Sequence, residues 1–121
     1  MKTLILALVL FMPGALLAAG GNVHLDSADI DLNDEAALQR GAKYFVNYCL
    51  NCHSASYMRY QKMTALGLTE EQIEDNLMFA GDKVGGLMTI AMKPGDAEKW
   101  FGAAPPDLTL TARLRGEDWL Y

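Results

Sequence analysis

Residues that bind metals or form disulfide bonds are scarce in this sequence. It has two cysteines and two histidines in 121 residues, and only two positions separate Cys49 from Cys52. A structural zinc site needs four ligands, and the second histidine, His24, lies far from His53 in the sequence. Because Cys52 and His53 are adjacent, their side chains cannot easily close one tetrahedron. A structural zinc site is therefore a poor explanation of the cysteine pair.

Basic side chains are also in short supply. The chain has 10 Lys and Arg against 15 Asp and Glu, which gives a formal net charge of -5. An acidic surface repels nucleic acid and anionic lipid head groups, so no nucleic-acid partner is expected. It favours basic partners instead, although charge alone is equally consistent with a surface kept for solubility. No internal repeat or low-complexity segment is present, and one small domain with a modest core is expected.

The N-terminal segment has the three parts of a secretory signal peptide. Lys2 precedes an apolar run over residues 4–12, after which a proline-glycine break and a group of small residues follow. The apolar run is too short for a permanent membrane anchor, and a buried N-terminal helix is the less favoured alternative. We expect a signal peptide over residues 1–20 and an exported domain over residues 21–121. Loss of Lys2 would make the net charge one unit more negative.

A first helix is predicted from Asn33, which is a good N-cap and is followed by two acidic residues. Leu38, Gly41, Ala42 and Phe45 then fall on one face. A glycine inside a helix costs about 1 kcal/mol relative to alanine, so Gly41 is expected to mark the close crossing of another backbone. A merely tolerated glycine is the alternative.

A second helix is predicted from Thr69, because Gln72 completes a capping box and an apolar side follows. Before the first helix, residues 21–32 are expected to form an extended arm with His24 as an ordinary surface histidine. Residues 81–109 are dense in glycine and proline and are expected to be mainly a long loop wrapped around a functional group. Residues 110–121 are expected to form a short helical turn, a break at a glycine and the start of another helix.

The cysteine pair and the histidine after it form a C-x-x-C-H motif. In a thiol-disulfide oxidoreductase such a pair starts a helix after a buried strand, whereas here it follows a helix and no strand-helix alternation is visible. Covalent haem attachment explains the spacing better, because on one tight helical turn two thiols reach the two vinyl groups and an imidazole lies beneath the iron. The signal peptide agrees, since c-type haem is attached outside the cytoplasm. We predict one covalent haem c, with Cys49 and Cys52 as thioethers and His53 as the proximal iron ligand.

Residues that surround the haem can be predicted as well. Pro105 and Pro106 lack amide hydrogens and hold the backbone rigid, so a carbonyl in this turn is expected to accept a hydrogen bond from His53 Nδ1. Buried haem propionates need charge-assisted donors. The candidates are Arg59, Trp100, Arg113 and Arg115. For each of them a solvated arginine or a plain core tryptophan is an equal alternative.

Three stretches of the chain resemble one known family. They are "RGAKYFVNYCLNCHSASYMRY", "GLTEEQIEDNLMF" and "WFGAAPPDLTLTARLRGEDWLY". Together they resemble cytochrome c1, the haem subunit of bacterial ubiquinol-cytochrome c reductase, over nearly all of residues 23–121. The C-x-x-C-H motif alone points only to c-type cytochromes, but "CHSASYMRY" joined to "PPDLT" and "RGEDW" is much more specific.

The resemblance implies a mostly α, cytochrome-c-like haem domain with long loops at the periplasmic face of the inner membrane. It implies an electron-carrier subunit, rather than an enzyme by itself, within a complex that contains cytochrome b. The electron would come from the Rieske iron-sulfur protein and pass to a cytochrome c. Matched residue by residue, the resemblance implies thioether cysteines at Cys49 and Cys52, the proximal ligand at His53, a haem-lining turn at Pro105 and Pro106, and a propionate partner at Arg113.

In the family, three parts lie beyond the segment that ends here at Tyr121: the distal methionine, a helix that packs on the first helix, and a C-terminal membrane anchor. We therefore expect an incomplete chain with an exposed apolar stripe at Gly41 and Phe45. The alternative is a short protein in which Met92 or Met88 is the sixth ligand, although packing is the commoner role for either. The functional alternative is a periplasmic haem protein with an open iron that binds small ligands, as a sensor or peroxidase.

Overall fold

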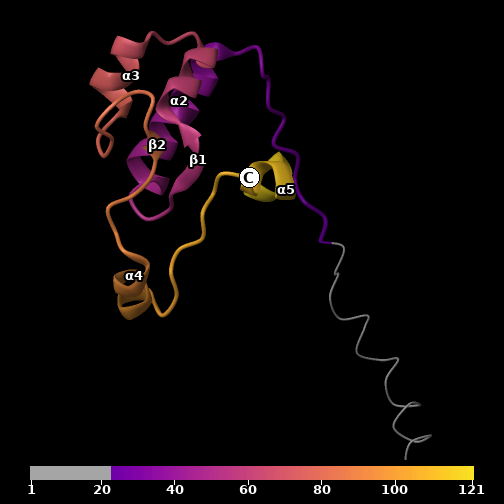
Figure 1. Ribbon diagram of the computed structural model, residues 1–121. Coiled ribbons are helices and arrows are strands. Elements are labelled where there is room, and N and C mark those ends of the chain that lie inside the picture. The colour runs from indigo at the N-terminus through magenta and orange to yellow at the C-terminus, as the bar shows by residue number, and fades with distance from the viewer. Residues whose placement is uncertain (1–22) are drawn as a thin grey trace, which may run out of the picture.

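Helices carry most of the regular structure, and two short strands pair beside them (Figure 1). The computed structural model describes residues 23–121, so the predicted signal peptide lies outside the described residues. The mostly α class with long loops is confirmed. In chain order the elements are α2 (Glu35–Tyr44), the π-helical turn η1 (Phe45–Cys49), β1 (Ala55–Arg59), the 3-10 helix η2 (Tyr60–Leu66), α3 (Glu70–Leu77), β2 (Leu87–Met88), α4 (Pro94–Phe101), α5 (Thr111–Arg115) and α6 (Glu117–Leu120).

The first helix, α2, starts one residue later than predicted. Asp34 is its N-cap, because the Asp34 carboxylate accepts a hydrogen bond from the Ala37 amide at 2.9 Å. Asn33 instead donates its backbone amide and its side-chain nitrogen to Asp31 Oδ1, at 2.8 and 3.1 Å. The prediction of Asn33 as the N-cap is therefore wrong, whereas the helix itself is confirmed.

The second predicted helix, α3, begins with the expected capping box. The Gln72 amide donates to Thr69 Oγ1 at 3.1 Å, and the Thr69 amide donates to Gln72 Oε1 at 2.9 Å. Two glutamates in the first turn complement the positive end of the helix dipole. Ile73 and Leu77 are buried, so the predicted apolar side of this helix is confirmed.

The strands β1 and β2 form an antiparallel pair that was not predicted from the sequence. Ala55 lies opposite Met88 and Arg59 opposite Leu87, with an irregular register between the two positions. Because β2 has only two residues, it is too short to show the alternating pattern of a strand. The pair joins the segment after the cysteine motif to the loop over residues 81–109.

The long loop predicted over residues 81–109 also contains a helix, α4. Pro94 stands in its first turn, and Gly102 ends it in the left-handed conformation with φ of 81°. A proline near the start and a glycine just past the end are typical of helix boundaries. The prediction of mainly irregular structure in this segment is therefore wrong for residues 94–101.

The buried core lies where α2, η1, η2, α3 and the strand pair meet. It consists of Val46, Leu50, Ala55, Tyr60, Met63, Ile73, Leu77 and Met88. Full burial of an aliphatic side chain such as Ile73 stabilises the fold by about 1.5–3 kcal/mol. Tyr60 has no exposed surface, and a Cβ added at Gly81 would meet the Tyr60 ring at 2.8 Å. Glycine at this position therefore lets the loop pass close to the ring.

Gly41 does not lie at a backbone crossing within residues 23–121. A Cβ placed on Gly41 meets nothing within 4 Å, so the predicted close crossing is absent from the described part of the chain. Gly41 instead lines an open apolar groove of about 270 Å³ together with Leu38, Phe45, Met58 and Leu66. This uncovered face of α2 agrees with the expected apolar stripe.

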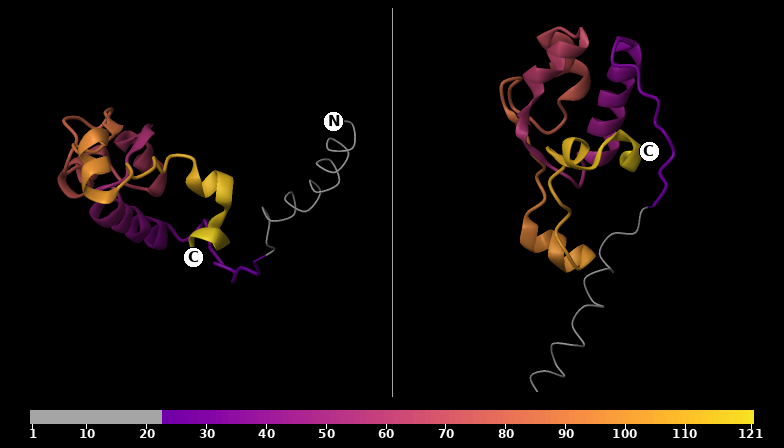
Figure 2. Two further views of the ribbon diagram at one scale, coloured as in Figure 1. Left: turned by 90° about the horizontal axis from the view of Figure 1, so that it is seen from below. Right: turned by 90° about the vertical axis from the view of Figure 1, so that its right-hand side faces the viewer.

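The two ends of the described chain meet. The predicted arm runs beside the C-terminal helices without forming a helix or strand of its own (Figure 2). The Ala28 amide donates to Asp118 Oδ1 at 2.9 Å, which ties the arm to α6. His24 is exposed, and Gly116 with φ of 85° separates α5 from α6, as predicted. Within residues 23–121, every helix is too short or too polar to span a membrane.

Candidate cofactor site

The C-x-x-C-H motif folds as one turn that continues from η1. The Leu50 amide reaches the Phe45 carbonyl, five residues back, at 2.9 Å, which is the hydrogen bond of a π-helix. The His53 amide then donates to the Cys49 carbonyl at 2.8 Å and closes the predicted turn. The thiols of Cys49 and Cys52 are free and half-buried, so they are not bonded to one another.

A backbone carbonyl fixes the tautomer of His53. Its Nδ1 lies 2.7 Å from the carbonyl oxygen of Pro106. Because a carbonyl oxygen can only accept, Nδ1 carries a proton, and in the neutral ring Nε2 then keeps a free lone pair. The predicted hydrogen bond between the ring and the Pro105-Pro106 turn is confirmed, with Pro106 as the acceptor. An imidazole held through Nδ1 is the arrangement that presents Nε2 to a metal.

The segment that follows Pro106 runs along β1, and three hydrogen bonds join it to this strand and to Ser54, the residue before the strand. They run from the Leu108 amide to the Ser54 carbonyl at 2.8 Å, from the Ser56 amide to Asp107 Oδ2 at 2.7 Å, and from the Tyr57 amide to Thr109 Oγ1 at 3.3 Å. On the other side, Ser54 Oγ accepts from the Ile90 amide at 3.1 Å. The residue after His53 is therefore tied to both neighbouring loops.

Asp107 is a site residue that was not predicted from the sequence. Its carboxylate accepts from the Ser56 amide at 2.7 Å and from the Thr109 amide at 2.9 Å. Burial raises the pKa of this carboxyl, but hydrogen bonds from the side chains and amides of Thr109 and Ser56 outweigh burial and hold the pKa well below its ordinary value. In a side-chain turn, an Asp carboxylate accepts a hydrogen bond from the amide two residues later, as Asp107 does from Thr109. The Asp in this loop was therefore the sequence signal that could have predicted the turn.

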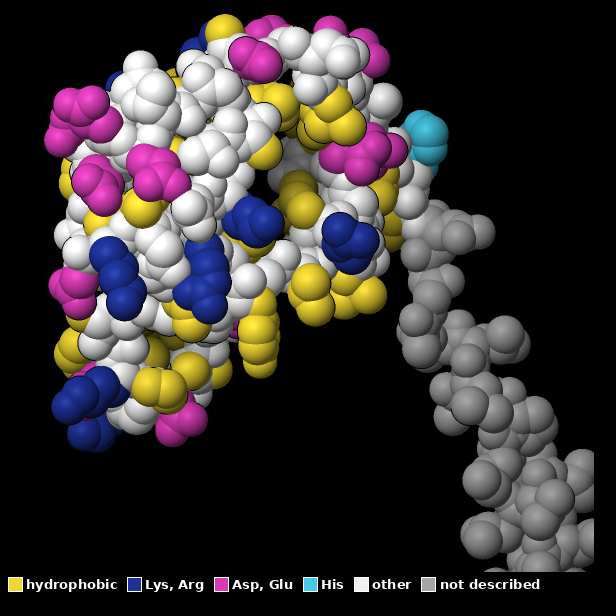
Figure 3. All heavy atoms as spheres, turned by 45° about the horizontal axis from the view of Figure 1, so that its top comes forward, with side chains coloured by type: hydrophobic (Ala, Val, Ile, Leu, Met, Phe, Trp, Pro, Cys, Tyr) yellow, Lys and Arg dark blue, Asp and Glu magenta, His cyan; other side chains and the backbone are white. Residues whose placement is uncertain are grey.

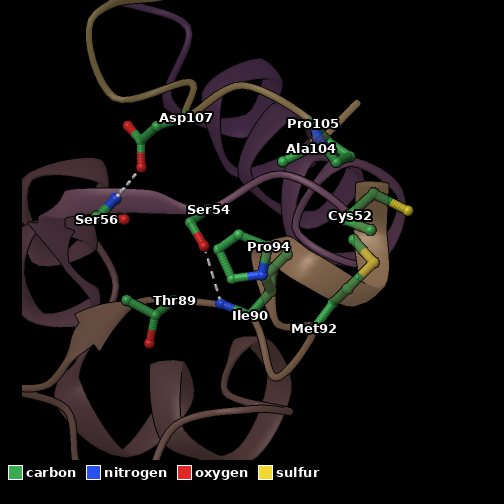
Figure 4. Close-up of a pocket in the computed structure, with 11 residues that line it drawn as sticks. Cys52, Ser54, Ser56, Thr89, Ile90, Met92, Pro94, Ala104, Pro105 and Asp107 are labelled. Carbon is green, nitrogen blue, oxygen red and sulfur yellow. Dashed lines mark hydrogen bonds between the residues drawn. The ribbon is translucent and has the colours of Figure 1, made fainter. Parts of the chain in front are cut away.

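A cavity of about 350 Å³ lies beside the motif (Figure 4). Its walls come from the turn around the motif, the loop before α4, the first turns of α4 and the loop that carries the two prolines. Figure 4 shows Cys52, Met92 and Pro105 toward one end and Ser56 and Thr89 toward the other. The volume falls within the range of small-molecule sites. The structure thus places Cys52 and Pro105 on one cavity.

A family match covers the part of the chain that holds the motif. Residues 28–84 match the model of the Cytochrome C1 family, and the whole chain is 56% identical to cytochrome c1 of Allochromatium vinosum. The chain belongs to the cytochrome c1 family. The resemblance seen in the motif and its flanking segments is thereby confirmed.

One further cytochrome c1 and one protein of another name are similar along nearly the whole chain. A protein named ammonia monooxygenase gamma subunit, from Nitrosomonas europaea, is 48% identical over 99% of this chain and 51% of its own length. Cytochrome c1 of Rhodospirillum rubrum is 28% identical over 98% of this chain and 56% of its own length. The match to the Allochromatium protein covers 50% of that protein. This chain therefore spans about half the length of the curated relatives it matches.

Proteins of the cytochrome c1 family bind haem c covalently, and Cys49 and Cys52 fit the C-x-x-C-H site for it. The structure agrees with this cofactor. Both thiols are free, and the tautomer of His53 leaves Nε2 available, with all three groups on one turn. The predicted cofactor, one covalent haem c, therefore suits the residues that are present.

The four predicted propionate partners do not line the cavity. Arg113 is exposed on α5, and the Arg115 guanidinium lies 5.1 Å from the centroid of an aromatic ring. Arg59 donates to the Gly85 carbonyl, and Trp100 is exposed. A contact of any of them with a propionate therefore stays a prediction.

Proposed function

We propose that this chain is the haem-bearing part of an electron-transfer subunit in a cytochrome bc1 complex. In this proposal Cys49 and Cys52 bind one haem c and His53 Nε2 is the proximal iron ligand. The sulfurs of Cys49 and Cys52 would each hold the haem through one thioether bond. The 2.7 Å contact between His53 Nδ1 and the Pro106 carbonyl carries the proposal, because it fixes the protonation and orientation that such a ligand needs.

In this proposal the residues of the chain hold the haem and keep water away from it. They do not make or break bonds in a substrate. Haem c supplies a one-electron carrier whose reduction potential depends on its axial ligands. The hydrogen bond to Pro106 keeps the His53 ring oriented and raises its basicity. Ile90, Met92 and Ala97 provide apolar lining on the cavity walls.

The proposed electron path runs from the Rieske iron-sulfur protein through this domain to a cytochrome c, with cytochrome b as a neighbour in the complex. We place the domain at the periplasmic face of the inner membrane, exported by the signal peptide over residues 1–20 and held by an anchor beyond Tyr121. Arg113 is the proposed propionate partner. The relatives named cytochrome c1 support this setting, and the net charge of -5 suits a basic cytochrome c.

The proposed sixth iron ligand is a methionine beyond Tyr121. Of the two methionines that are alternatives within the described chain, Met92 lines the cavity, whereas Met88 is buried in the core opposite Ala55 with 2% of its surface exposed. Met88 therefore packs the core, and Met92 is the better placed of the two.

Mass spectrometry of exported protein, produced with a c-type maturation system, tests the attachment. The wild type should gain the mass of one haem that acid-acetone extraction does not remove. The double variant Cys49→Ser with Cys52→Ser should lose all extraction-resistant haem, because both sulfur-carbon bonds are gone. Ser56→Ala is the matched control, since it changes a cavity residue but keeps both thiols. A wild type without tetrapyrrole mass, or a double variant that keeps it, would show that the proposal is wrong.

A further inference from the structure

We infer that Asp107 is a positioning residue for His53, because its carboxylate fixes the Pro106 carbonyl that accepts the Nδ1 hydrogen bond. The inference rests on the proposed function, since it treats His53 as the iron ligand. Asp107 acts through the backbone, because the peptide bond joins its nitrogen to the carbonyl carbon of Pro106. Any displacement of the Asp107 backbone therefore moves the acceptor that orients the His53 ring.

The two prolines make an anchor outside the turn necessary. Neither has an amide hydrogen, so neither can donate a backbone hydrogen bond to β1. The first connections after the prolines are the Asp107 carboxylate, which accepts from the Ser56 amide at 2.7 Å, and the Leu108 amide, which donates to the Ser54 carbonyl at 2.8 Å. The position of the Pro106 carbonyl thus depends on these two connections.

Both oxygens of the Asp107 carboxylate are engaged. Oδ2 binds the Ser56 amide, while Oδ1 binds the Thr109 amide at 2.9 Å, and the Thr109 hydroxyl also hydrogen-bonds to the carboxylate. An ionised carboxylate offers only acceptors, so it suits a position surrounded by donors. The strand that carries Ser56 is itself fixed, because Ala55 is buried and pairs with Met88. The carboxylate therefore links the proline turn to a rigid part of the core.

Replacing Asp107 by asparagine tests this link with almost no change in size. In Asp107→Asn, one acceptor oxygen becomes an NH₂ group that faces an N–H donor. The turn should then shift, and the hydrogen bond between His53 Nδ1 and the Pro106 carbonyl should weaken. A weaker bond makes the imidazole a poorer electron donor to the metal, so the reduction potential should rise.

The experiment uses the full exported chain with haem attached. NMR of the reduced, diamagnetic protein follows solvent exchange of the His53 Nδ1 proton, and a redox titration gives the potential. In Asp107→Asn, exchange should quicken about tenfold, the factor that corresponds to the net contribution of one hydrogen bond. Thr109→Val removes the hydroxyl that binds the carboxylate and accepts from the Tyr57 amide at 3.3 Å. It changes no charge, and it should move both quantities in the same direction by less.

Asp31→Asn is the matched control. Asp31 also accepts the amide two residues further on, from Asn33 at 2.8 Å, and it lies at the end of the arm rather than beside β1. This variant removes the same charge, and it should leave the Nδ1 exchange rate unchanged.

Several outcomes would overturn the inference. Unchanged exchange in Asp107→Asn and Thr109→Val would do so, and so would a higher potential in Asp107→Asn without faster exchange, since that is an effect of charge alone. If Asp107→Asn does not fold, the Nδ1 exchange rate of Thr109→Val tests the inference instead. Absence of haem from the wild type would contradict the proposed function instead, so the two failures can be told apart.

Discussion

A single proton decides which nitrogen a histidine presents to a metal. In this chain the Pro106 carbonyl keeps that proton on Nδ1 of His53 across 53 positions of sequence. Proline suits this role, because its φ is fixed and its missing amide hydrogen leaves the turn with acceptors only. The turn depends in addition on Asp107, whose carboxylate binds the amides of Ser56 and Thr109.

Asp107 should make the stability of the protein depend on pH in acid. Its pKa is lowered in the folded chain, so its stabilisation is complete above the ordinary Asp value of about 3.9 and is lost as the pH falls toward the lowered pKa. At neutral pH the free energy of unfolding of the wild type should exceed that of Asp107→Asn. The two values should approach each other as the pH falls below about 4. Denaturant unfolding across this range measures both proteins, and a gap that stays constant with pH would contradict the prediction.

Among the elements, those with local signals were predictable from the sequence. The capping box of Thr69 and Gln72 fixes the start of α3 within four residues. The pair β1–β2 depends instead on contacts between distant residues such as Ala55 and Met88, and it is too short to leave a pattern. In α4 the boundary signals of Pro94 and Gly102 were present, but the density of glycine and proline around them indicated a loop.

The features of the site were likewise predictable only where their signals are local. The cysteine turn is local, and the acceptor for His53 follows from the chemistry of two adjacent prolines, so both were predictable. The contact of Asp107 with Ser56 joins residues 51 positions apart and exists only because the loop lies along β1. Similarly, no local pattern determines whether Arg113 on α5 approaches the cavity, and the structure leaves it exposed.

Gly41→Ala tests whether another segment packs on α2. In the described chain a Cβ at Gly41 meets nothing within 4 Å, so alanine should stabilise the 121-residue chain by about 0.5–1 kcal/mol. Gly95 in α4 is equally open, and Gly95→Ala is a matched control with the same expected sign. Denaturant unfolding measures both variants. If Gly41→Ala destabilises while Gly95→Ala does not, a backbone crosses at Gly41, as expected from the sequence.

Over the whole molecule, charge is unevenly distributed. Figure 3 shows acidic side chains mainly along the upper and left parts of the face it displays, with basic side chains across its middle and lower parts. The formal net charge is -5, so the field at long range attracts a basic partner even where local patches differ.

Association with a basic cytochrome c should therefore slow as salt is added. Raising the ionic strength from about 0.01 to about 0.15 M shortens the screening length from about 30 to about 8 Å, and the association rate constant should fall several-fold. Stopped-flow electron transfer from the reduced protein measures this rate. An acidic cytochrome c of similar potential is the control and should not be slowed by salt. A rate that does not change for the basic acceptor would exclude electrostatic steering.

The two contacts that define His53 close over very different lengths of chain. Its amide meets the Cys49 carbonyl within one turn, whereas its ring meets Pro106 only after the whole intervening segment has folded back. Short closures form quickly and lose little entropy, and long ones come later. If the chain is exported and loaded with haem as proposed, its paired sulfurs would be displayed before the ring finds its acceptor. Attachment of the porphyrin and adjustment of its electron affinity would then be separate steps of maturation.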